Sequence, residues 1–298
     1  MIQNFAQVLK VAEKGKPATI AVAAADDKEV LTAIQMAVRS GFARAILMGD
    51  LQNIKSKLGG SLPDGIEIQD VASDLEAAEV AAELIRDKKA QIIMKGMLNT
   101  SDFLRPVLKH LRTGRKLSHL AAFEIPGEDK LVFHTDGGMN ISPSCEEKQD
   151  ILRNAVEALA CLGYSTIHVA CLAANEKVDE KMPATVDARA LQEVSDQFPG
   201  CIIEGPVALD VAVSPEAAKH KGIESRVSGK TDLFLVPGIE SGNILGKALI
   251  YYAGAQMAGV VLGAACPIVL TSRAETVQGK FYSIALACLM RGNLQAPQ

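Results

Sequence analysis

Short apolar runs that alternate with longer amphipathic stretches are the feature that most constrains the fold of this chain. Eleven runs predict strands, at 18–24, 45–49, 66–71, 91–94, 117–124, 131–134, 166–171, 201–205, 233–236, 260–262 and 268–271. The stretches between them predict helices at 26–40, 73–87, 145–162, 187–198, 207–219, 241–255 and 276–290. Strands that alternate with helices through short connections indicate an α/β protein with mostly parallel strand pairing.

Two local signals refine this prediction. Ser73 is followed three residues later by Glu76, a capping-box pattern that predicts a helix start. Residues 117–134 interrupt the alternation of strands and helices, because the turn from Pro126 to Asp129 joins two candidate strands with no helix between them. We therefore expect a hairpin there and a boundary between two α/β units near 136–143.

Composition excludes several classes of function. The chain has 298 residues, of which 48% are hydrophobic, enough for one large or two ordinary domains. A net charge of -4 gives no reason to expect that the chain as a whole binds nucleic acid. No apolar stretch reaches the ~18 residues of a membrane span, and the first residues lack a signal-peptide pattern, so we expect a cytoplasmic protein. The six cysteines and five histidines show no metal-type spacing.

Chemistry-bearing residues gather where predicted strands end, which is where open α/β sheets bind ligands. Lys95 and Gly96 follow one strand, and Thr100 and Arg105 lie at the start of the next helix. A glycine lets a ligand approach the backbone, and a lysine supplies a charge for phosphate. A capped helix with a solvated arginine is the alternative that the residues leave open.

The strand at 268–271 leads directly into Ser272, Arg273 and Glu275. A guanidinium suits bidentate phosphate recognition, a serine can hydrogen-bond a thiol, and a carboxylate can act as a base. A helix cap would explain Ser272 and Glu275 but not Arg273, because the helix dipole disfavours a cation at that end. His134 is a further candidate, since it precedes Thr135 to Gly138 at a strand end.

One apparent phosphate-binding loop is rejected. Residues 227–231 read Val-Ser-Gly-Lys-Thr, but Glu224 stands where a P-loop requires glycine, and the segment runs into a strand rather than a helix.

Several blocks in order resemble the phosphate acetyl/butyryltransferase family, most closely its butyryltransferase branch. The blocks are Ile93-Met94-Lys95-Gly96 with Asn99-Thr100-Ser101-Asp102, Thr135-Asp136-Gly137-Gly138-Met139-Asn140, Lys181-Met182-Pro183-Ala184-Thr185, Glu204-Gly205-Pro206-Val207, Gly238-Ile239-Glu240-Ser241-Gly242-Asn243 and Leu270-Thr271-Ser272-Arg273-Ala274-Glu275. Together they cover nearly the whole chain.

The resemblance implies a two-domain α/β architecture like that of isocitrate and isopropylmalate dehydrogenases, with the active site in an interdomain cleft. The last helix would return to the first domain, so we expect domains at 1–138 with 274–298, and at 139–273. The implied reaction converts acyl-CoA and inorganic phosphate to acyl phosphate and CoA, with a short, butyryl-like acyl group favoured and acetyl or branched groups open. No metal or redox cofactor is implied, and the implied partners are these substrates and a second copy of the chain.

The resemblance also assigns residues. Ser272 would orient the CoA sulfur, while Arg273 and Arg105 would hold phosphate. The substrate-binding set comprises Lys95, Gly96, Thr100, Arg105, Asn140, Gly242 and Asn243. The acetyltransferase branch has a catalytic aspartate near the position of Gly279, so Glu275 becomes the candidate base here.

Two rival functions and one rival route remain open on the sequence. A dehydrogenase of the same fold would need clustered aspartates for a metal, and Asp187, Asp196 and Asp210 are available. A silent member of the family would bind CoA or acyl phosphate without turnover. A covalent route through Cys145 is the alternative to direct transfer.

Overall fold

The computed structural model describes residues 2–272 and 275–291 and divides into two compact units. Unit 1 comprises Met1–Asn4 and Lys116–Met257, and unit 2 comprises Phe5–Arg115 and Ala258–Gln298. These bounds differ from the predicted domains, 1–138 with 274–298 and 139–273. The difference arises because the predicted hairpin, β5 (Ser118–Glu124) and β6 (Val132–Thr135), pairs with later strands of unit 1.

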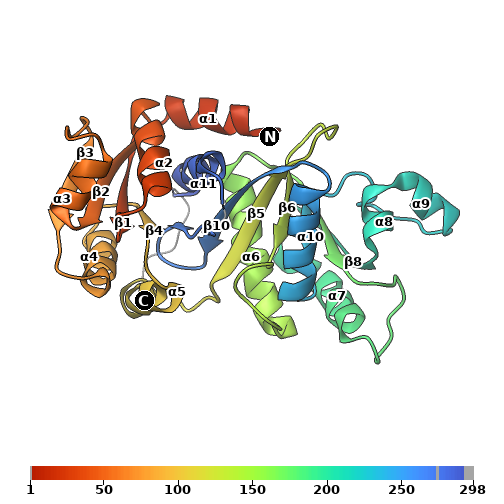
Figure 1. Ribbon diagram of the computed structural model, residues 1–298. Helices are drawn as coiled ribbons and strands as arrows, with labels where there is room; N and C mark the ends of the chain where they lie inside the picture. Colours follow the sequence, from red (N-terminus) through yellow and green to blue (C-terminus); the bar gives the residue numbers. More distant parts are fainter. Residues whose placement is uncertain (1, 273–274, 292–298) are drawn as a thin grey trace. The chain divides into compact units, whose positions relative to one another are not determined.

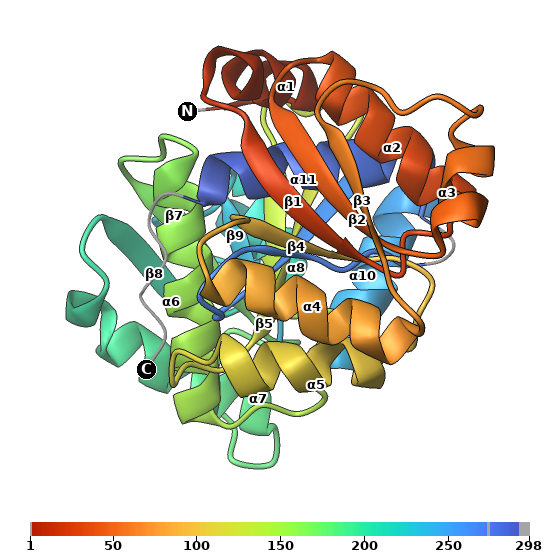
Figure 2. The ribbon, with the colours of Figure 1, turned by 90° about the vertical axis from the view of Figure 1, so that its left-hand side faces the viewer.

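Unit 2 is a doubly wound α/β unit with strand order β3-β2-β1-β4-β11-β10 (Figures 1 and 2). Its neighbours pair in parallel, except that β10 and β11 are antiparallel. The strands are β1 (Ala18–Ala23), β2 (Ala43–Gly49), β3 (Ile66–Asp70), β4 (Ile92–Lys95), β10 (Gln256–Leu262, shared with unit 1 at its start) and β11 (Ile268–Val269). The helices are α1 (Phe5–Lys14), α2 (Lys28–Arg39), α3 (Leu51–Lys57), α4 (Asp74–Arg86), α5 (Thr100–His110) and α11 (Val277–Met290).

Helices cover both faces of this sheet. α1 and α2 pack against α11 on one face, and α4 packs against α5 on the other (Figure 2). Stacked rings of Phe5 and Tyr282, with centroids 4.4 Å apart, join α1 to α11. The chain's last helix is thus part of the core that the first strands build.

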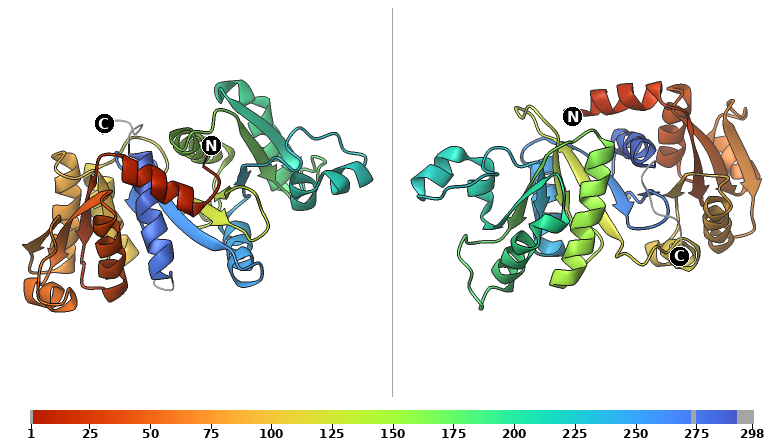
Figure 3. Two further views of the ribbon diagram at one scale, coloured as in Figure 1. Left: turned by 90° about the horizontal axis from the view of Figure 1, so that it is seen from above. Right: turned by 180° about the vertical axis from the view of Figure 1, so that it is seen from behind.

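Unit 1 has strand order β5-β6-β9-β7-β8, antiparallel between β5 and β6 and parallel elsewhere. Its further strands are β7 (Ile167–Leu172), β8 (Cys201–Val207) and β9 (Leu233–Leu235). Its helices are α6 (Cys145–Cys161), α7 (Pro183–Glu193), α8 (Leu209–Val213), α9 (Pro215–His220) and α10 (Ile239–Tyr251). α10 lies in front of the unit 1 sheet in Figure 1, and α6 lies in front of it in the rear view of Figure 3. The two helices therefore cover opposite faces of the sheet.

The predicted strands are all present, and the predicted hairpin is confirmed. Ser73 caps α4 as predicted, accepting the N–H of Glu76 at 3.2 Å. The single helix predicted at 207–219 is wrong, because Ser214 and Pro215 end α8 and start α9. The helix predicted at 187–198 begins earlier, with Pro183 in its first turn.

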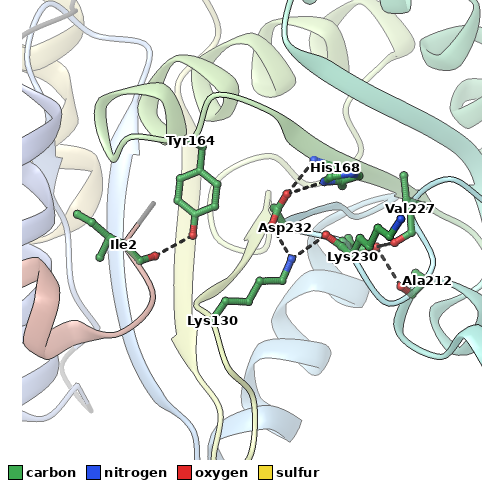
Figure 4. Close-up of polar contacts among 9 residues, drawn as sticks. Ile2, Lys130, Tyr164, His168, Ala212, Val227, Lys230 and Asp232 are labelled. Carbon is green, nitrogen blue, oxygen red and sulfur yellow. Dashed lines mark hydrogen bonds and ion pairs between the residues drawn. The ribbon is translucent and has the colours of Figure 1, made fainter.

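Figure 4 shows a polar cluster around Asp232. Asp232 directly precedes β9, which runs parallel to β6, so the cluster lies at the opposite end of these strands from the loop that follows β6. Its carboxylate contacts Lys130 Nζ at 2.5 Å and accepts the backbone N–H of His168 at 2.9 Å. The preceding residue, Thr231, donates to the carbonyls of Ala212 and Val227. The Thr231 hydroxyl is thus used within the protein, and the segment leads into β9 rather than a helix, which agrees with the rejection of a P-loop.

Among the described residues, no helix is both long and apolar enough to cross a membrane.

Candidate functional site

Two groups of predicted site residues lie at the carboxyl end of the unit 2 sheet. β4 runs parallel to both β1 and β11, with Lys95 beside Ala23 and Met94 beside Val269. The chain beyond Val269 leads within three residues to Ser272. Parallel strands end at one sheet edge, so Lys95 and Ser272 follow neighbouring strands at the same edge.

Lys95 is held in place. Its side chain is buried, with the residue 7% exposed, and Nζ donates to the carbonyls of Gly96 at 3.0 Å and Leu98 at 2.9 Å. These two carbonyl acceptors hold the buried ammonium at the end of β4. Gly96 cannot be replaced without movement, because a Cβ there would lie 2.0 Å from the carbonyl oxygen of Ala24.

The start of α5 follows this loop. Asn99 is the N-cap residue but makes no side-chain capping bond, and Thr100 is exposed. The Arg105 guanidinium lies 3.6 Å from Asp102 and its side chain is 73% exposed. The structure therefore places Thr100 and Arg105 on the helix that follows Lys95, with Arg105 paired only to a residue of its own helix among the described contacts.

The segment between β11 and α11 carries the predicted catalytic residues. Arg273 lies outside the described residues. Ser272 is exposed, and its carbonyl accepts the N–H of Glu275 at 3.1 Å. Burial raises the pKa of the half-buried Glu275 carboxyl to about 7, while the charge of Lys280 acts in the opposite direction. A carboxyl that titrates near neutral pH is suited to act as a general base.

The other predicted binding residues belong to unit 1, around the loop that follows β6. Asp136 organises this loop: one carboxylate oxygen accepts the N–H groups of Gly138 at 2.8 Å and Met139 at 2.9 Å. The other oxygen accepts the N–H of His119 at 3.1 Å and the amide of Asn140 at 2.6 Å. Because Asn140 also donates to Leu117 O, both of these bonds use Nδ2, which leaves Oδ1 as an acceptor for a ligand.

Gly137 brings α10 onto the same loop. A Cβ at Gly242 would lie 2.6 Å from the Cα of Gly137, so the two backbones touch. The side chain of Asn243 also donates to the Gly137 carbonyl, at 3.4 Å. Asn140, Gly242 and Asn243 are thus gathered in unit 1, whereas Lys95, Gly96, Thr100, Arg105, Ser272 and Glu275 belong to unit 2.

Sequence reasoning missed the supporting residues Asp136 and Lys280. Asp136 was part of a recognised block, but its bond from the N–H of His119 in β5 is a contact that sequence spacing does not reveal. His134, a candidate from the sequence, is buried against Phe123 with ring centroids 4.7 Å apart. Burial lowers the pKa of His134 to about 3, with a smaller contribution from His119, so it is a neutral core residue.

One cluster has the residue types of a metal site. Ligand atoms of Glu79, Glu83 and His110 lie within 4.8 Å of one another. The Lys109 ammonium already contacts Glu79 at 2.5 Å, and Arg86 lies 3.6 Å from Glu83. The hydrogen bonds from Lys109 and then His110 lower the pKa of Glu79, which fits an exposed ion-pair network on α4 and α5.

Comparison with known proteins identifies the family. The model of the phosphate acetyl/butaryl transferase family matches residues 63–288. The chain belongs to this family. A phosphate butyryltransferase of Clostridium acetobutylicum is 42% identical over 98% of this chain and 100% of its own length. The predicted resemblance is therefore confirmed, and family membership makes this chain an acyltransferase.

Solved structures agree on the fold. A branched-chain phosphotransacylase from Enterococcus faecalis V583 superposes with a TM-score of 0.84 at 29% identity, over 93% of this chain and 99% of that one. A 4-hydroxythreonine-4-phosphate dehydrogenase from Klebsiella pneumoniae shares the fold more distantly, with a TM-score of 0.56 at 12% identity over 93% and 100% of the two chains.

The dehydrogenase alternative is not favoured. Two of its three candidate metal ligands are held by lysines: Asp187 contacts Lys148 at 2.6 Å, and Asp210 contacts Lys221 at 2.8 Å. These carboxylates are therefore neutralised within the protein.

Proposed function

We propose that this chain transfers a short acyl group between coenzyme A and inorganic phosphate, giving acyl phosphate and free CoA reversibly. A butyryl-like group is favoured by the name of the relative from Clostridium acetobutylicum, and the neighbour from Enterococcus faecalis keeps branched groups open. Acetyl also remains open, since the family model covers both kinds of transferase.

The observation that carries this proposal is the common sheet edge in unit 2, where Lys95 and Ser272 follow the neighbouring strands β4 and β11. In the direction of acyl phosphate formation, a phosphate oxygen attacks the thioester carbonyl and the C–S bond breaks. Lys95, Arg105 and Arg273 neutralise the phosphate, and Ser272 hydrogen-bonds the departing sulfur. In reverse, Glu275 takes the thiol proton of CoA, and the thiolate attacks the acyl phosphate.

The remaining residues bind substrate without entering the bond changes. Gly96 lets the loop after Lys95 pack closely against Ala24, and Thr100 begins α5, whose first N–H groups can bind an anion. Asn140 offers its Oδ1 to an N–H or O–H group of the substrate, and Gly242 and Asn243 border the same loop. Direct transfer requires no cofactor beyond the two substrates. Burial, as the largest effect, raises the pKa of the Cys145 thiol, which disfavours the covalent route.

The proposal includes the isocitrate/isopropylmalate dehydrogenase-like two-domain architecture, supported by the distant likeness to a dehydrogenase. Division into domains at 1–138 with 274–298 and 139–273 stays a prediction, as does the cytoplasmic location.

A homodimer is part of the proposal, and α10 supports it. Gly242 and Gly246 face inward, while Ile244 and Tyr251 are 67% and 76% exposed and lie seven residues apart on one helical stripe. Glu240 and Lys247 are exposed on the same stripe. An antiparallel pairing of two copies about a two-fold axis near Ile244 sets Glu240 of one copy against Lys247 of the other, which makes the stripe self-complementary.

The test is release of free thiol from acetyl-CoA, butyryl-CoA and isobutyryl-CoA, with and without inorganic phosphate. Wild type is compared with Arg273→Ala and with Arg86→Ala, an exposed arginine paired to Asp87 that serves as the matched control. We expect phosphate-dependent release that falls by about 100-fold in Arg273→Ala and stays unchanged in Arg86→Ala. Absence of phosphate-dependent release with every acyl-CoA would disprove the proposed reaction and favour a silent binder.

A further inference from the structure

Lys280 occupies a position that stability alone does not explain. It lies in the first turns of α11, is 3% exposed, and has its Nζ 2.9 Å from the Glu29 carboxylate of α2. Burying an ammonium is costly, and the dipole at a helix start disfavours a cation. The cost is offset only if this charge has a specific partner, and the structure gives it two.

The second partner is the main chain of the predicted catalytic segment. Nζ of Lys280 donates to the carbonyl of Glu275. The N–H of Glu275 in turn donates to the carbonyl of Ser272 at 3.1 Å. Two consecutive hydrogen bonds thus connect a rigid helix to the residue that the proposed function places at the CoA sulfur.

Helix α11 has anchors other than this lysine. Thr276 caps the helix by accepting the N–H of Gly279 at 3.0 Å. Ser283 is fully buried, donates to the Gly279 carbonyl at 2.8 Å, and accepts the N–H of Gly259 in β10 at 2.9 Å. The cap closes the start of α11 and the serine joins the helix to β10, while Lys280 adds a contact from this helix to the main chain at Glu275.

We propose that Lys280 is a positioning residue, which holds the main chain at Glu275 and, through the bond from Glu275 N–H to Ser272 O, also Ser272, so that both side chains face the reacting groups. The expected effect on turnover rests on the proposed function. The positioning of the main chain rests only on contacts within unit 2. Glu29 balances the buried charge from α2 and is not itself part of the segment.

Turnover tests the functional consequence. Lys280→Met keeps the aliphatic stem and removes the donor, and we expect kcat to fall by about 10- to 100-fold with little change in the KM for phosphate. Ser283→Ala is the matched control, because it removes the α11 contacts with Gly259 and Gly279 and keeps the bond from Lys280 to Glu275. Glu29→Gln keeps the bond to Glu275, and like Ser283→Ala it should retain activity within about threefold.

Amide hydrogen exchange tests the structural part without using turnover. In Lys280→Met, the amide of Glu275 should lose protection while those in the last turns of α11 keep it. Lys280→Gln, which keeps a neutral donor, should fall between wild type and Lys280→Met in both measurements, and it replaces Lys280→Met if that variant does not fold.

The outcomes separate the two proposals. If wild type is inactive and the Glu275 amide still loses protection in Lys280→Met, the proposed reaction is rejected but the positioning role is kept. Equal kcat in Lys280→Met and wild type, or equal losses in Lys280→Met and Ser283→Ala at matched melting temperature, would overturn the role of Lys280.

Discussion

Gly96 shows how a single residue sets the geometry of the loop that follows β4. A Cβ at this position would lie 2.0 Å from Ala24 O and 2.8 Å from Ala23 O, and neither carbonyl can move without disturbing β1. We therefore expect Gly96→Ala to reduce the free energy of unfolding by about 3 kcal/mol and to abolish phosphate-dependent thiol release. Urea unfolding and the thiol assay measure the two effects.

Gly41→Ala is the control for this substitution. Gly41 has a φ of +79°, and an added Cβ would have nothing within 4 Å, so only backbone strain is introduced, at about 1 kcal/mol. Equal losses of stability in the two variants would mean that the Gly96 loop yields to the added methyl group, against our expectation.

At the residue scale, strand ends were the informative signal. Lys95 and Ser272 each follow an apolar run, so the sequence placed both at strand ends and the structure puts those ends on one edge. Lys280 carried no such signal, because a lysine in an amphipathic stretch normally faces solvent. Its burial and its contacts with Glu29 and with the Glu275 carbonyl distinguish it, and these follow from the fold.

At the scale of elements, the packing of α10 on β6 makes stability depend on pH. Gly246 of α10 covers His134, where an added Cβ would lie 3.0 Å from the imidazole Cε1. The pKa of His134 is about 3 when folded and ordinarily 6.5. Between these values the unfolded state binds a proton that the folded state does not, so stability is lost as pH falls below 6.5.

The loss amounts to about 1.4 kcal/mol per pH unit, or about 2 kcal/mol between pH 7 and pH 5. His134→Leu removes this titration. Between pH 7 and pH 5, the free energy of unfolding of this variant should therefore fall by about 2 kcal/mol less than that of wild type. Urea unfolding of both proteins at the two pH values measures the difference. Parallel pH dependences would show that His134 is not buried as a neutral group.

Strands were easier to predict than helices for a physical reason. A buried parallel strand is a short apolar run with sharp ends, and every one of the predicted runs became a strand. Helix ends depend on caps that compete with one another. Ser214 caps α9 by accepting the N–H of Ala217 at 3.2 Å, which divided a stretch whose apolar spacing suggested one helix.

At the scale of the whole chain, the sequence predicted the α/β class, but the contacts divide the chain elsewhere than expected. The hairpin of β5 and β6 looked like the end of the first domain, because it interrupts the alternation of strands and helices. β6 pairs in parallel with β9, from Phe133 beside Leu233 to Thr135 beside Leu235. This pairing joins the hairpin to a strand that comes much later in the chain, a contact that local sequence does not encode.

The exposed stripe of α10 leads to a prediction about assembly. Ile244 and Tyr251 leave apolar surface in water on the outer side of α10, and a second copy would bury it. We expect Ile244→Asp to convert a dimer to a monomer of 31.6 kDa, because two carboxylates would meet near the two-fold axis. Light scattering after size-exclusion chromatography measures the mass.

Leu75→Asp is the matched control for Ile244→Asp, since Leu75 is 54% exposed in the first turn of α4, where an acid is favourable. The control should keep the mass of wild type. If wild type itself has a mass of 31.6 kDa at micromolar concentration, the stripe does not bind a second copy. If Ile244→Asp keeps the dimer, another surface forms it, and the complementarity of Glu240 and Lys247 has no role in assembly.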